Sequence, residues 1–81
     1  MFNLGILQFV IEYKNPESNR KKVAQLVSNA SSKSFNMLVL PETWTTGYSE
    51  DVFYNVKSYA EREDGPSIGL LRELARENEI Y

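Results

Sequence analysis

The stretch "NMLVLPETWTTGYS", residues 36 to 49, carries the strongest structural signal in the chain. Residues 37 to 40 are all apolar, which predicts a short strand covered on both faces, as in a parallel sheet. Pro41 ends this strand because proline has no N–H to donate to a neighbouring strand. Glu42 follows at once, so an ionisable group is expected just beyond the carboxyl end of a buried strand.

The residues before this strand complete a β-α-β unit. Residues 2 to 11, "FNLGILQFVI", are apolar on both alternating faces except at Asn3 and Gln8, and predict a central parallel strand rather than an edge strand. Asn15 is a candidate helix cap and Pro16 suits the first helical position. One apolar helix face follows at i, i+3, i+4 and i+7: Val23, Leu26, Val27 and Ala30. The long connection predicts parallel strands joined by a right-handed crossover.

The residues after Glu42 predict one further helix. Asp64 or Gly65 is the expected cap and Pro66 lies in the first turn, followed by an apolar stripe: Ile68, Leu71, Leu74 and Ala75, with Leu70 alongside. Residues 49 to 63 predict a loop with at most one short helix. The final "EIY" is typical of a third strand that has barely begun. We therefore expect an α/β fold with a natural start at Met1 that is truncated before or within its third strand.

Composition limits the classes of function. The chain has 81 residues, which is one domain at most, and a chain of this size buries only about 60 to 65% of its unfolded surface. A net charge of −2 gives no footprint for nucleic acid, and the basic run Arg20–Lys22 is interpreted as a solvated helix face. No stretch approaches the roughly 18 to 20 apolar residues that span a bilayer. We expect a cytoplasmic protein with neither nucleic acid nor membrane as partner.

Cysteine and histidine are both absent. A disulfide framework, a thiol nucleophile, a Ser-His-Asp triad and a zinc site of the usual kind therefore cannot be assembled from these residues alone.

Glu42 is the candidate functional residue. Ligands of open parallel sheets bind beyond the carboxyl ends of the strands, and partial burial, which disfavours the charged form, would make this carboxylate a stronger proton acceptor, as a general base requires. Two alternatives stay open at this point. Glu42 is structural in a noncatalytic α/β fragment or interaction module, or it is a magnesium ligand. The magnesium reading is weakened because the nearest acids, Glu50 and Asp51, lie beyond the loop.

The runs "LGILQF", "LVLPETWTTGY" and "YAEREDGPSIGLLRELARENEI" together resemble the amino-terminal part of the nitrilase superfamily, the carbon-nitrogen hydrolases, over essentially the whole chain. The resemblance implies that residues 1 to 81 are an incomplete portion of one carbon-nitrogen hydrolase domain. It also implies a four-layer αββα sandwich with a Glu-Lys-Cys mechanism. Glu42 would be the base, while the lysine and cysteine lie beyond Tyr81, so this chain by itself would be inactive.

The same resemblance favours the amidase branch, acting on small linear amides, over true nitrilases. It implies no cofactor, a small-molecule amide as substrate and a homo-oligomer in the full-length protein. Tyr48 would contact substrate, and Trp44 would line the pocket or pack the loop against the second sheet.

The remaining polar and glycine residues near the loop have more local interpretations. Gly47 is expected to supply a backbone conformation that other residues adopt poorly. Gln8 either reaches the pocket or, as we favour, bonds neighbouring backbone. Lys57 does not match the position of the family's lysine and is assigned to the surface. The three threonines of the loop are interpreted as loop hydrogen-bonders, not nucleophiles, because no base is available to activate them: Thr43, Thr45 and Thr46.

Overall fold

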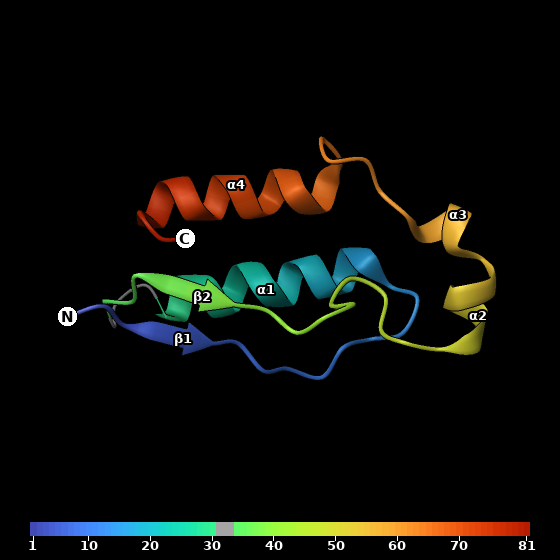
Figure 1. The fold of residues 1–81 in the computed structure, drawn as a ribbon, viewed down its shortest axis with the longest axis horizontal. Coiled ribbons are helices and arrows are strands. Elements are labelled where there is room, and N and C mark those ends of the chain that lie inside the picture. Colours follow the sequence, from blue (N-terminus) through green and yellow to red (C-terminus); the bar gives the residue numbers. More distant parts are fainter. Residues whose placement is uncertain (31–33) are drawn as a thin grey trace.

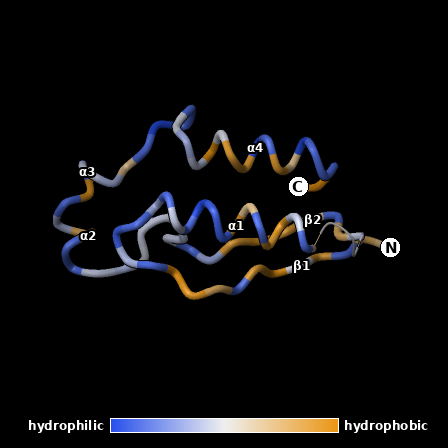
Figure 2. The backbone as a smooth tube through the Cα atoms, turned by 180° about the vertical axis from the view of Figure 1, so that it is seen from behind, coloured by the Kyte–Doolittle hydropathy of each residue, from blue (hydrophilic) through white to orange (hydrophobic). Residues whose placement is uncertain are grey.

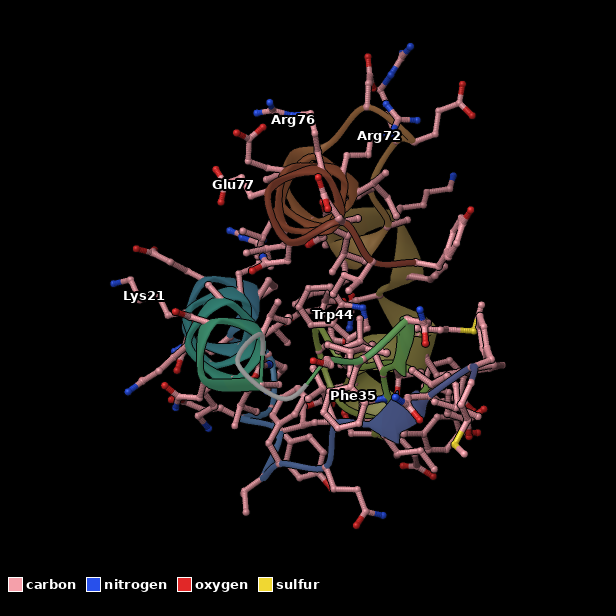
Figure 3. The ribbon with its side chains drawn as sticks, turned by 90° about the vertical axis from the view of Figure 1, so that its left-hand side faces the viewer. Lys21, Phe35, Trp44, Arg72, Arg76 and Glu77 are labelled. Atoms are coloured by element: carbon pink, nitrogen blue, oxygen red, sulfur yellow. The ribbon has the colours of Figure 1, made fainter. Side chains whose placement is uncertain are left out.

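A computed structural model describes residues 1–30 and 34–81. Its elements are β1 (Leu4–Ile6), α1 (Pro16–Ala30), β2 (Met37–Val39), α2 (Glu50–Tyr54), α3 (Val56–Tyr59) and α4 (Pro66–Asn78). The two long helices, α1 and α4, cover the same face of the small sheet, while α2 and α3 lie at the far end of the molecule (Figures 1 and 3). The predicted βαβ-α order is confirmed, but residues 49 to 63 form two short helices instead of one at most.

The two strands are parallel, as predicted, with Leu4 opposite Met37 and Ile6 opposite Val39. A third chain segment joins the other edge of β2. The Tyr81 N–H donates to the Asn36 carbonyl at 3.0 Å, and the Leu38 N–H donates to the Tyr81 carbonyl at 3.0 Å. This is the bonding pattern of a parallel neighbour. The expected start of a third strand is therefore present, beside β2.

The predicted extent of the first strand is wrong, and its central place stays a prediction for the full-length protein. β1 has three residues, and its pairing with β2 ends where the Leu7 N–H donates to the Val39 carbonyl. Apolar composition indicates which residues can be covered by other layers. A strand also needs a partner for its backbone hydrogen bonds, and the partner of β1 ends early because β2 stops before Pro41. Among the described residues β2 lies between two neighbours, and β1 forms the edge.

The core lies between the sheet and the two long helices. Leu7, Val23 and Val27 are buried at its centre, and partly buried apolar side chains pack around them: Phe9, Leu26, Leu38, Leu40, Trp44, Leu71, Leu74 and Ile80. Five residues of the predicted apolar stripes belong to this core, namely Val23, Leu26, Val27, Leu71 and Leu74, whereas Ile68 is 39% exposed. The helix caps are also as predicted, since Asn15 Oδ1 accepts the Ser18 N–H and Gly65 precedes Pro66 at the start of α4.

The opposite face of β1 is bare. Leu4 and Ile6 are 57% and 68% exposed and Val10, further along the same segment, is 83% exposed. Figure 2 shows this apolar run along β1 and the residues that follow it. Both long helices lie on the other side of the sheet, so no described element covers this face. The second sheet that the family resemblance implies for it stays a prediction.

We expect this chain by itself to associate, because a contiguous exposed apolar face promotes contacts between molecules. Gel filtration should show a concentration-dependent shift to species larger than a monomer. The threonine variant replaces Leu4, Ile6 and Val10 together by threonine, a polar residue that is compatible with strands. This variant should be mostly monomeric. A compact monomer of the unmodified chain at high concentration would contradict the expectation.

Arg20 joins the two long helices and is not part of a solvated face, contrary to the prediction. Its Nη1 donates to Ser67 Oγ at 3.3 Å and lies 3.8 Å from Glu61 Oε2. The Glu61 carboxylate in turn accepts the Ser67 N–H at 2.8 Å and the Ser67 O–H at 2.6 Å. Glu61 thus satisfies a free N–H in the first turn of α4, where the helix dipole favours an anion. Lys22 also has a protein partner, the Val10 carbonyl, at 2.7 Å.

The pKa of Glu61 in the folded state determines how the contact between Glu61, Ser67 and Arg20 responds to acid. Partial burial opposes ionisation, but the two hydrogen bonds from Ser67 and the charge of Arg20 outweigh it and lower the pKa below its ordinary value. Since the folded-state pKa is the lower one, the stabilisation is complete above the ordinary glutamate value and is lost as the pH falls through the folded-state value.

We therefore expect Glu61→Gln in the threonine variant to be less stable than its parent at pH 7 and to converge with it in acid. Urea midpoints measured from about pH 6 down to about pH 3 would follow this change. Glu63→Gln, an exposed acid in the same loop, is the matched control. Parallel curves for Glu61→Gln and its parent would refute the assignment.

No helix within residues 1–30 and 34–81 is long and apolar enough to cross a membrane.

Candidate functional site

Glu42 lies three residues after the end of β2, at the carboxyl end of the sheet, as predicted. It opens a tight turn that folds back toward α1 (Figure 1). Within this turn the N–H groups of Thr46 and Gly47 both donate to the Thr43 carbonyl, at 3.2 and 2.8 Å. Thr43 and Gly47 have left-handed backbone angles, with φ of 52° and 73°. The turn of residues 42 to 47 is thus closed by its own backbone.

The Glu42 side chain itself is exposed. The expected partial shielding from solvent is therefore absent in this chain, because the turn presents the residue at an end of the sheet where no other described element covers it. The Glu42 carbonyl accepts the Thr43 O–H at 2.7 Å. None of the described residues makes a hydrogen bond to the carboxylate, so within this chain the turn fixes only the backbone position from which the side chain extends.

Asn19 attaches the turn to the rest of the fold, and sequence analysis did not single it out. It is completely buried in α1. Its Nδ2 donates to the carbonyls of Thr45 and Glu12, both at 2.8 Å, and its Oδ1 accepts the Glu12 N–H at 2.8 Å. A signal was available, because Asn19 precedes Val23 by four residues and so lies on the apolar face of the helix, where an amide must find partners.

Trp44 provides a second attachment of the turn. It packs against the buried core cluster, and Figure 3 shows it between the sheet and the two long helices. Of the two expectations for this side chain, a pocket wall or a contact to the second sheet, the structure supports neither. A third attachment is made by the backbone, where the Lys14 N–H donates to the Thr46 carbonyl at 2.9 Å.

Gly47 has the special backbone conformation that was expected of it. Its positive φ is disfavoured for residues with a side chain, and a Cβ at this position would overlap the Tyr13 ring. We expect Gly47→Ala to destabilise the threonine variant by about 2 kcal/mol, measured by urea denaturation. Gly69→Ala is the matched control, because nothing lies within 4 Å of a Cβ there and a helix interior favours alanine, so it should stabilise. Equal effects would refute the argument.

The other predicted site residues lie at or near the surface. Tyr48, directly after the turn, is 75% exposed, and Gln8 is exposed beside a shallow hollow that Pro41 also lines. Lys57 is exposed in α3, in keeping with its surface assignment. Two of the loop threonines form hydrogen bonds through their hydroxyl groups, since Thr43 Oγ1 donates to the Glu42 carbonyl and Thr46 Oγ1 donates to the Gly47 carbonyl at 3.0 Å. Within the described ranges no three acidic side chains gather as a metal site.

Comparison of the sequence with known proteins points to one family. The sequence profile of the carbon-nitrogen hydrolases matches residues 3–81. Similar proteins include a 2-oxoglutaramate amidase of Bacillus subtilis, 32% identical over 99% of this chain and 29% of the relative, and an omega-amidase of Xenopus laevis, 31% identical over 99% of this chain and 28% of the relative. A nitrilase of Pyrococcus abyssi is 27% identical over the whole chain and 31% of its own length. No solved structure gives a significant match.

The chain thus spans less than a third of the length of the relatives that it matches. Because the family profile covers nearly every residue, including the strand, the turn and Glu42, the chain belongs to the carbon-nitrogen hydrolase family.

Proposed function

We propose that the full-length protein containing this chain is an amidase of small linear amides in which Glu42 is the general base. The observation that carries the proposal is the placement of Glu42 beyond the carboxyl end of a parallel strand, on a turn anchored to the core, in a member of this family. The amidase names of the relatives support the substrate class.

The chemistry needs a carboxylate at this position. Attack of a thiol on an amide requires a base that takes the thiol proton, and the same acid can give that proton to the departing nitrogen, which leaves as ammonia. Water then attacks the thioester, and the carboxylate takes a proton from it. A cation or N–H donors must stabilise the oxyanion in both steps. The chain has no cysteine, so we propose that it supplies the base and depends on the rest of the domain for the thiol and the lysine.

Further details of the same proposal concern the surroundings of Glu42. Residues 1 to 81 form one portion of a single catalytic domain, and the full-length protein is a homo-oligomer. Tyr48 contributes to the substrate pocket, since it is exposed next to the turn that carries Glu42. The alternative is a noncatalytic unit in which Glu42 is not a base, and the carboxylate that faces water without a bond to any described residue is the observation that favours it.

The substrate proposal is tested with the full-length protein and a pair of matched compounds. Ammonia release is measured with 2-oxoglutaramate, a small linear ω-amide, and with a nitrile of the same chain length. We expect release from the amide, and loss of this activity after treatment with iodoacetamide, which alkylates thiolates. Activity on the nitrile alone would contradict the amidase assignment. Amide hydrolysis that survives complete thiol alkylation would contradict the mechanism.

A further inference from the structure

We propose that Asn19 is a positioning residue for Glu42, holding the turn of residues 42 to 47 in the geometry that proton transfer requires. The inference rests on the proposed function, in which Glu42 is the base. Asn19 touches neither substrate nor thiol in this arrangement. It acts through the backbone of the turn.

Every polar atom of the Asn19 side chain takes part in a hydrogen bond. The amide has two N–H donors, and they go to the carbonyls of Thr45 and Glu12; its oxygen accepts the Glu12 N–H. All three distances are 2.8 Å, and the residue has no exposed surface. Loss of these bonds would leave the amide without partners in a buried position, and the Glu12 N–H and Thr45 carbonyl without their acceptor and donor, so the arrangement favours one conformation.

Asn19 connects two segments that leave the same end of the sheet. Glu12 follows β1 and Thr45 follows β2, and the side chain from α1 bridges them. The Lys14 N–H bond to the Thr46 carbonyl reinforces the same junction. Two adjacent carbonyls of the turn, those of Thr45 and Thr46, are therefore held by the segment that precedes α1 and by α1 itself.

The bonds that Asn19 and the Lys14 N–H make to the turn reach Glu42 through the backbone of the turn. The N–H groups of Thr46 and Gly47 close the turn on the Thr43 carbonyl, and Thr43 is the residue after Glu42. Since no described residue bonds the Glu42 carboxylate, these backbone bonds are what holds the backbone of Glu42 in place within the chain. A base displaced by about 1 Å can lose roughly a hundredfold in rate.

The required donors and acceptor explain why the residue is asparagine. Leucine has the same branching at Cγ, with two somewhat larger methyl groups, but it would leave the Glu12 N–H and the Thr45 carbonyl unpaired and the Glu12 carbonyl with only the longer bond from the Asn15 N–H, at 3.4 Å. Aspartate would keep the acceptor for the Glu12 N–H but set an oxygen against two carbonyls, and it would place a charge in a buried position. We expect Asn19→Leu to lower kcat of the full-length amidase by about a hundredfold with KM unchanged, and Asn19→Asp to lower it less, because a protonated acid can still donate one bond.

The test separates positioning from simple loss of stability. Turnover is measured well below the unfolding temperature of each variant, in the wild-type background and with Glu42→Gln. If Asn19 acts through Glu42, Asn19→Leu should cost nothing further once Glu42 is glutamine. Amide exchange of Thr46 and Gly47 should also rise by roughly tenfold or more, while exchange in the middle of α4 stays unchanged. Asn78→Leu is the control, because its Nδ2 donates only to the Leu74 carbonyl of its own helix.

The outcomes distinguish the two proposals. If Glu42→Gln retains near-normal turnover, the proposed function fails, and the role of Asn19 in positioning a base fails with it. If Glu42→Gln is inactive but Asn19→Leu turns over normally, or if the two losses multiply, only the inference on Asn19 is overturned. Unchanged amide exchange at Thr46 and Gly47 would overturn it as well, whatever the kinetics show.

Discussion

Glu42→Gln in the full-length protein is expected to preserve the fold and to lower turnover of small amides by about three to four orders of magnitude. General-base contributions are typically 10²- to 10⁴-fold, and this residue is proposed to serve both the thiol and the hydrolytic water, so a value near the upper end is expected. Stability should be nearly unaffected, because the side chain is exposed and no described residue bonds its carboxylate. The measurement is kcat together with the unfolding temperature.

Two further variants make this result specific. Glu42→Asp keeps the acid but shortens its reach by one methylene group, so turnover should fall between wild type and Glu42→Gln. Glu50→Gln removes an exposed acid at the start of α2 and should leave turnover unchanged. A Glu42→Gln enzyme with near-normal kcat would show that Glu42 is not the general base.

The order of elements could be predicted because it depends on local signals. Asn15 and Pro16 mark the start of α1, Gly65 and Pro66 mark the start of α4, and Pro41 marks the end of β2. These residues act through their own backbone, so their effect is legible without knowledge of the fold. The length of β1 was not predictable in this way, because its pairing depends on how far a distant partner extends.

The attachments of the candidate site depend on contacts between distant residues, and that is why sequence analysis missed them. Asn19 binds Thr45, and Arg20 approaches Glu61, each across a long stretch of chain. The pattern of α1 could indicate a polar residue on the apolar face but not which carbonyl it would meet. Glu42 is exposed within this chain, and its partial shielding stays a prediction for the full-length protein, since the sequence places it at the end of the sheet without saying what covers that end.

Trp44→Ala is expected to lower the free energy of unfolding of the threonine variant by about 3 kcal/mol, the low end of the range for deleting a large aromatic from a core. The indole packs on the buried cluster of Leu7, Val23 and Val27, in a chain whose core is small, so the cavity left behind would be a large part of it. Urea denaturation measures the change, and Trp44→Phe should lose less because it leaves a smaller void.

Tyr48→Ala is the comparison that separates packing from substrate contact, since Trp44 lies within the turn of residues 42 to 47 and Tyr48 directly follows it. Tyr48 is 75% exposed, so its loss should change stability by less than about 0.5 kcal/mol. In the full-length protein the same change should raise KM for small amides, because we propose that the side chain contacts substrate, whereas Trp44→Phe should leave KM unchanged. A Trp44→Ala chain as stable as its parent would show that the turn does not depend on the core, and the anchoring of Glu42 would then rest on Asn19 and the Lys14 backbone bond alone.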